Sequence, residues 1–240
     1  MSEKPPQRGD DQFAGEVNSM FDRISGVYDR MNRVMTAGLD QTWRARAADR
    51  VRLEPGQKAL DLCCGTGDLA LMLAERVGSE GEVTGADFSR PMLEIATEKA
   101  ARDLVGQVEY QWADALDLPF EDESFDALTI AFGARNLADL PKGLAEMHRV
   151  LKPGGRLAIL EITQPRRQPL ATFFKLWFDR IVPVLGKAAG DSSAYEYLPE
   201  SVRSFPDAET LGARLDAAGF RHVRWTLMAG SIIALHSGVR

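Results

Sequence analysis

One segment constrains the fold of this chain more than any other: a short apolar run enters a turn with two glycines, and the next residues have helical spacing. The run is Ala59–Cys63, the glycines are Gly65 and Gly67, and the helix begins at Asp68. A glycine has no Cβ, so the backbone can bend sharply there and approach a ligand closely. This unit predicts an α/β, doubly wound fold with a ligand at the turn.

The acidic residues around this turn indicate the kind of ligand. With Ala70, the two glycines satisfy the G-x-G-x-x-A pattern of dinucleotide sites. Asp61 and Asp68 would repel the pyrophosphate that such a helix N-terminus otherwise binds. They would attract the ammonium and sulfonium groups of S-adenosylmethionine, which has the same adenosine and no phosphate. We therefore predict an S-adenosylmethionine site that includes Asp61, Gly65, Thr66 and Gly67, with Thr66 at the methionine portion.

Strands and helices alternate after this turn, which implies a parallel sheet with crossover helices on both faces. The predicted strands are Ala59–Cys63, Glu82–Asp87, Val108–Trp112, Ala127–Phe132 and Arg156–Glu161, and helices begin at Asp68, Pro91 and about Pro141. The tail differs, because Arg221–Met228 and Ser231–His236 are separated by only two residues and must form an antiparallel hairpin. This combination is typical of the Rossmann-like class I S-adenosylmethionine-dependent methyltransferase fold and not of dehydrogenases.

The 240 residues are enough for one substantial α/β domain. We expect a disordered tip over residues 1–12 and a single methyltransferase domain over residues 13–240. Within it, residues 13–52 form a helical prefix and residues 164–205 form a lid inserted after the fifth strand. The lid contains an apolar helical face, predicted from its spacing to be Phe173, Phe174, Trp177, Phe178, Ile181, Val182 and Leu185.

Charge and cysteine content exclude several classes of function. The formal net charge is −6, with 29 Lys and Arg against 35 Asp and Glu, so nucleic acid is not an expected partner. Cys63 and Cys64 are adjacent, a spacing that fits neither a zinc site nor a disulfide framework, and we expect no metal. The polar start and the lack of a run of about 18 apolar residues predict a cytoplasmic protein.

The ends of the later strands carry further candidates, because a doubly wound sheet binds its ligand across these ends. Asp87 ends the second strand 22 positions after Gly65 (87 − 65), close to the roughly 20 expected for an acid that binds ribose hydroxyls. Phe88 is placed either against the adenine or in the core. After the third strand, the Ala113 N–H and the Asp114 carboxylate are predicted to contact adenine, although Asp114 could instead cap the next turn.

Five segments carry a further signal: Tyr28–Trp43, Arg149–Thr163 and residues 121–126, 131–136 and 229–236. The first two resemble the two signatures of the ubiquinone/menaquinone biosynthesis C-methyltransferases, and the other three resemble further segments of that family. The resemblance places Thr66, Asp87, Ala113 and Asp114 on the family's cofactor-binding positions. Four residues depart from the pattern: Thr36, Asp40, Thr163 and Ala131. Since Ala131 replaces a serine near the cofactor, any contact there must come from its backbone.

The resemblance implies methylation of a ring carbon of a prenylated quinol, converting demethylmenaquinol to menaquinol or acting on the corresponding ubiquinol precursor. Arg135 and Asn136, after the fourth strand, are the predicted catalytic residues. A guanidinium there would stabilise the phenolate form of the quinol, and Asn136 would orient its hydroxyl or a water. The alternative is that Arg135 makes a surface ion pair while Asn136 or Asp139 caps the following helix.

Tyr28 and Tyr195 are the residues predicted to contact the acceptor. Because a prenylated quinol resides in the bilayer, we expect transient peripheral contact with the inner face of the membrane, without an anchor. A homodimer is left open. Two other functions are also left open: a methyltransferase for another phenolic or lipid acceptor, and a non-catalytic cofactor-binding subunit of a quinone-biosynthesis assembly.

Overall fold

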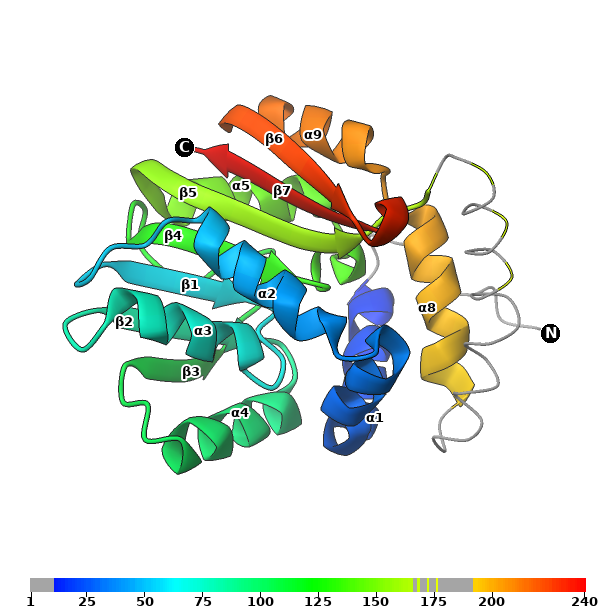
Figure 1. Ribbon diagram of the computed structural model, residues 1–240, viewed down its shortest axis with the longest axis horizontal. Coiled ribbons are helices and arrows are strands. Elements are labelled where there is room, and N and C mark those ends of the chain that lie inside the picture. The colour runs from blue at the N-terminus through cyan, green and yellow to red at the C-terminus, as the bar shows by residue number, and fades with distance from the viewer. Residues whose placement is uncertain (1–10, 166–167, 169–171, 173–175, 177–191) are drawn as a thin grey trace.

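A twisted sheet of seven strands forms the centre of the molecule (Figure 1). The computed structural model describes residues 11–165, 168, 172, 176 and 192–240. The strand order is β3-β2-β1-β4-β5-β7-β6; β1 to β5 are parallel, and β7 is antiparallel to both β5 and β6. The predicted fold class is therefore confirmed. The strands are β1 Lys58–Leu62, β2 Glu82–Asp87, β3 Val108–Trp112, β4 Phe125–Ala131, β5 Leu151–Ile162, β6 Arg221–Met228 and β7 Ile233–Val239.

Helices cover both faces of the sheet, because the central strands are apolar on both sides. On β1, Leu60 and Leu62 face the cluster formed with α5 (Leu140–Val150) and α9 (Ala208–Ala217). Ala59 faces the opposite cluster, formed with α2 (Leu39–Arg50) and α3 (Asp68–Val77). Helix α4 (Arg90–Arg102) packs against β2 and β3. The sheet is thus buried between two helical layers.

Side-chain caps fix where two of these helices begin. Ser89 accepts a hydrogen bond from the Met92 N–H at the start of α4, and Asp139 accepts one from the Lys142 N–H at the start of α5. Of the two residues considered as caps for α5, Asp139 is the one that serves. Its position leaves the Asn136 side chain available for other contacts.

Strand β5 begins earlier than the sequence predicts. The sequence predicts a strand that starts at Arg156, after the Pro153–Gly155 segment, but α5 ends at Val150 and β5 follows directly at Leu151. The pairing register with β4 shifts between Phe125 and Ala127, and Gly154 has φ +81°. The Pro-Gly-Gly segment is therefore an irregularity within the strand, of the kind glycine permits.

Helices α1 (Asp11–Thr36) and α8 (Ser192–Ser204) stand beside the sheet edge toward which the parallel strands point (Figure 1). They pack together through an apolar cluster that includes Met20, Ile24 and Val202. The part of the chain that the structure describes also contains the 3₁₀ helices η1 (Ala134–Asn136) and η3 (Ala229–Ser231). None of the helices in the described ranges is long and apolar enough to cross a membrane. Of the tip predicted over residues 1–12, residues 1–10 lie outside the described residues, whereas residues 11 and 12 are the start of helix α1, so the tip was predicted two residues too long. The predicted apolar lid face also lies outside the described residues.

Candidate active site

A cavity of about 370 Å³ opens at the carboxyl ends of β1, β2 and β4 and is closed on one side by α1. Small-molecule sites typically have volumes of about 300–1,000 Å³. Eight of the residues that the sequence predicted for the site line this cavity: Tyr28, Gly65, Asp87, Phe88, Ala113, Asp114, Ala131 and Asn136. Asp61, Thr66, Gly67 and Arg135 do not line it, and the side chain of Tyr195 lies outside the described residues.

Asp87 holds the glycine turn against the end of β2. Its carboxylate accepts hydrogen bonds from the Gly65 N–H at 2.8 Å and from the Ser89 N–H at 2.9 Å. Burial raises the pKa of Asp87, and these backbone donors only partly oppose the rise. Gly65 has φ +55°, and a Cβ built on it would meet no atom within 4 Å. The turn is therefore open toward the cavity, and the carboxylate beside it suits an adenosyl group with free ribose hydroxyls.

The predicted adenine subsite is arranged differently from the expectation. Phe88 lines the cavity and packs against Trp112, with ring centroids 5.2 Å apart. The Ala113 N–H donates to the Asp87 carbonyl at 3.1 Å, so it is already used by the β2–β3 ladder and is not directed at an adenine nitrogen. The Asp114 carboxylate accepts from the Leu116 N–H at 2.9 Å and also lines the cavity. Asp114 thus caps a turn and remains within reach of a ligand.

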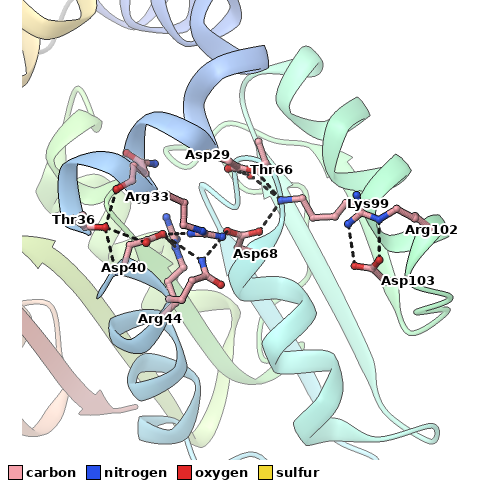
Figure 2. Close-up of polar contacts among 12 residues, drawn as sticks. Asp29, Arg33, Thr36, Asp40, Arg44, Thr66, Asp68, Lys99, Arg102 and Asp103 are labelled. Carbon is pink, nitrogen blue, oxygen red and sulfur yellow. Dashed lines mark hydrogen bonds and ion pairs between the residues drawn. The ribbon is translucent and has the colours of Figure 1, made fainter. Parts of the chain in front are cut away.

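Asp68 is neutralised by two cations (Figure 2). Lys99 contacts one of its carboxylate oxygens at 2.6 Å, and Arg33 contacts the other at 2.9 Å. Burial works to raise the pKa of Asp68, but the hydrogen bonds and charges of these partners outweigh it and bring the pKa to about 2. The expectation that Asp68 offers its charge to a sulfonium ligand is therefore wrong. The balancing cations come from α1 and α4, far from the turn in sequence.

Thr66 belongs to the same network and points toward α1 (Figure 2). Its hydroxyl donates to Asp29 at 2.6 Å and accepts from Lys99 at 3.3 Å. Lys99 also pairs with Asp29 at 2.9 Å. A contact between Thr66 and the methionine portion of the cofactor stays a prediction. Polar side chains therefore link the glycine turn to α1.

Gly67 and Asp61 support the turn from outside the cavity. Gly67 has φ +84°, and a Cβ there would overlap the Tyr110 hydroxyl, so only glycine fits. Asp61 is buried and accepts a hydrogen bond from the Thr129 hydroxyl at 2.7 Å. Burial raises the pKa of Asp61 to about 7, although Thr129 and the charge of Arg44 favour the ionised form. The buried carboxyl of Asp61 therefore keeps its proton to a higher pH than an exposed aspartate does.

Arg135 is buried and paired with Glu161, a residue that the sequence analysis missed. Its Nη1 donates to Glu161 Oε1 at 2.8 Å, and its backbone N–H donates to Glu161 Oε2 at 3.2 Å. The side chains are only 7% and 1% exposed, so the alternative of a surface ion pair is excluded. A glutamate within the apolar run Leu157–Ile162, at the carboxyl end of a central strand, was a signal that could have revealed this pairing.

Tyrosines surround the end of η1. Burial acts to lower the pKa of Arg135, but the charges of Glu161, Tyr28 and Tyr197 raise it overall. Both phenol groups therefore lie near the guanidinium. The Tyr197 hydroxyl donates to Asn136 Oδ1 at 3.1 Å. Asn136 and Tyr28 are therefore the polar groups of this corner that reach the cavity, while Arg135 lies behind them. No group of three or more His, Cys, Asp or Glu able to hold a metal occurs among the residues that the structure describes.

The chain is similar to characterised methyltransferases in sequence and in structure. It is 49% identical to a demethylmenaquinone methyltransferase of Thermus thermophilus over 92% of this chain and 100% of the relative. It is 42% identical to a ubiquinone/menaquinone biosynthesis C-methyltransferase UbiE of Idiomarina loihiensis, over 93% and 90% of the two chains.

Solved structures agree on the fold. A S-adenosylmethionine-dependent methyltransferase from Aquifex aeolicus matches with a TM-score of 0.59 at 24% identity, over 78% of this chain and 84% of its own. A methyltransferase from Thermotoga maritima matches with a TM-score of 0.63 at 20% identity, over 92% and 98%. A family profile covers residues 8–240. With this coverage and the cavity at the strand ends, the chain belongs to the ubiE/COQ5 methyltransferase family.

Proposed function

We propose that this enzyme transfers a methyl group from S-adenosylmethionine to a ring carbon of a prenylated quinol, converting demethylmenaquinol to menaquinol. The ubiquinol precursor is the alternative acceptor. One observation carries the proposal: a single cavity joins the Gly65–Asp87 end, suited to the adenosyl group, to Asn136 and to an apolar stripe on α1. A donor and an aromatic acceptor would therefore share one cavity.

The residues at the sheet end fit the cofactor. Asp87 would accept hydrogen bonds from the ribose hydroxyls, Phe88 would lie against adenine, and Asp114 would accept from its amino group. Ala131, which lines the cavity at the end of β4, would contribute its backbone. The bound cofactor supplies an electrophilic methyl group on a sulfonium.

The protein's part in the reaction is to position the ring and favour its phenolate. A quinol carbon becomes nucleophilic when a neighbouring hydroxyl loses its proton, and transfer between an anion and a cation is favoured in a site that excludes water. Asn136 is the predicted catalytic residue that reaches the cavity and can orient that hydroxyl. Arg135 does not line the cavity, but its pair with Glu161 fixes η1, so we assign it a positioning role. Direct contact between Arg135 and the phenolate stays a prediction.

Purified protein, S-adenosylmethionine and a reduced short-chain demethylmenaquinol analogue test this function under anaerobic conditions. Mass spectrometry should show a product heavier by one methylene, and the benzoquinol analogue run in parallel distinguishes the two acceptors. A strain lacking the gene should accumulate demethylated quinone. An unchanged quinone pool, together with no turnover of either analogue, would refute the proposal.

We also propose peripheral contact with the membrane that holds the acceptor. Val34 and Leu39, at the junction of α1 and α2, are 62% and 50% exposed, which leaves two apolar side chains on the surface beside the helix that closes the cavity. Vesicle co-sedimentation with and without quinone measures this contact. Recovery of all protein in the supernatant under both conditions would contradict it. Tyr195 as an acceptor contact and a homodimer stay predictions.

A further inference from the structure

Helix α1 presents a stripe of residues to the cavity, and one of them is polar without being satisfied. Ala14, Val17, Asn18 and Phe21 line the cavity at the spacing of one helix face, whereas Gly15, Glu16 and Ser19 are exposed. The Asn18 Oδ1 atom is buried and has no hydrogen-bond partner in the ranges that the structure describes. Most buried polar atoms in folded proteins are paired, so this oxygen lacks a partner that a ligand donor could supply once the Asn18 amide turns toward the cavity it lines.

The contacts of α1 on either side locate Asn18 within the cavity. One turn later, Asp22 accepts a hydrogen bond from the Ser89 hydroxyl at 2.5 Å, next to Asp87 and the predicted ribose subsite. Five residues earlier, Phe13 packs near Tyr197, with ring centroids 6.4 Å apart, on the side of Asn136. Asn18 therefore lies between the cofactor end and the corner where Asn136 reaches the acceptor.

We propose that Asn18 hydrogen-bonds a ring hydroxyl of the quinol acceptor and so positions the ring for methyl transfer. The candidate donors to Asn18 Oδ1 are the acceptor hydroxyls, the cofactor's ribose hydroxyls and its amino groups, and the cofactor-binding measurement below separates the first from the other two. Asp87 already provides a carboxylate for the ribose, and the neighbours of Asn18 in the stripe, Val17 and Phe21, are apolar groups suited to an aromatic ring. The acceptor hydroxyl is therefore the partner, a conclusion that depends on the proposed function.

The test compares Asn18→Leu, which keeps the side-chain size and removes the polar atoms, with Val17→Ala, which alters the same wall without removing a hydrogen bond. Under anaerobic conditions, the KM for the reduced demethylmenaquinol analogue should rise roughly 5- to 10-fold in Asn18→Leu, the effect expected for one hydrogen bond. The dissociation constant of S-adenosylmethionine, measured by calorimetry, should stay within about twofold, because the amide is assigned to the acceptor. Asn18→Ser is the second variant, in case the leucine impairs folding.

An acceptor analogue with one ring hydroxyl replaced by hydrogen makes the test specific. In the wild type and in Val17→Ala, it should inhibit more weakly than the dihydroxy compound, whereas Asn18→Leu should bind the two alike. Weaker cofactor binding with an unchanged acceptor KM would assign the amide to the ribose and overturn the inference. Unchanged constants for both ligands would show that water satisfies the amide, which also overturns it. No turnover of the reduced demethylmenaquinol analogue by the wild type would instead refute the proposed function.

Discussion

The buried pair of Arg135 and Glu161 allows a quantitative test of the site's construction. Glu161→Gln keeps the shape of the side chain but leaves the guanidinium, 7% exposed, without its 2.8 Å carboxylate partner. Removing one member of a buried pair costs about 3–5 kcal/mol, because a charge stays buried without compensation. Since domains are stable by about 5–15 kcal/mol, this is a large fraction of the total.

The matched control is Glu82→Gln on β2, which breaks the pair of Glu82 with Lys58. That pair has an N···O distance of 2.6 Å, but its side chains are 67% and 50% exposed, so its loss should cost only about 0–1 kcal/mol. Urea unfolding followed by circular dichroism gives both free energies of unfolding. If Glu161→Gln cost no more than Glu82→Gln, the reasoning from burial would be refuted. Replacing both partners, as Arg135→Met with Glu161→Leu, should restore part of the stability because no charge remains buried.

Three further predictions concern the turn and its supports. Asp61 has a folded pKa near 7, above its unfolded value, so its contribution to stability is present at pH 4 and lost as pH rises through 7. Asp61→Asn should therefore gain stability relative to the wild type between pH 5 and 8. Equal pH profiles of the two proteins in thermal melts would contradict this. Lys99→Met removes the cation shared by Asp29 and Asp68, so hydrogen exchange of α1 amides should accelerate about tenfold while β4 is unaffected. Equal α1 exchange in the variant and the wild type would show that Lys99 does not hold α1 against the glycine turn. Asp87→Asn should weaken binding of S-adenosylmethionine about 10- to 100-fold by calorimetry, the range for a charged acceptor, and undiminished affinity would remove Asp87 from the site.

Local sequence signals predicted the central elements well. The bounds of β2 and β3 agree with the prediction, and a helix begins where Pro91 predicted one, with Ser89 as its cap. These features depend on short-range chemistry: apolar runs bounded by turns, and a hydroxyl before a proline at a helix start. The start of β5 was missed because Pro153–Gly155 carries strong turn signals, although β4 pairs with Leu151 before this segment and with Arg156 after it, which keeps the segment within the strand.

The candidate site was predicted in part. The glycine turn, Asp87, Phe88, Asp114 and Asn136 were identified because each follows a strand, and parallel strands bring their carboxyl ends to one edge. Glu161 and Asn18 were missed. Their roles depend on partners or spaces supplied by distant segments, Arg135 in one case and the cavity beside α1 in the other.

By itself, the sequence determined the order of strands and helices, the antiparallel tail and the glycine turn at which the cofactor is predicted to bind, because these depend on spacing and on glycine geometry. Only the tertiary structure decided which charges face a ligand. Asp68 is one of the two acids from which a cationic ligand was predicted at the Gly65–Gly67 turn. Its charge is balanced by Arg33 and Lys99, which lie 35 and 31 residues away in the sequence. Electrostatic interactions act through space, so the net charge of a site is set by every element packed against it and not by the segment that contains its motif.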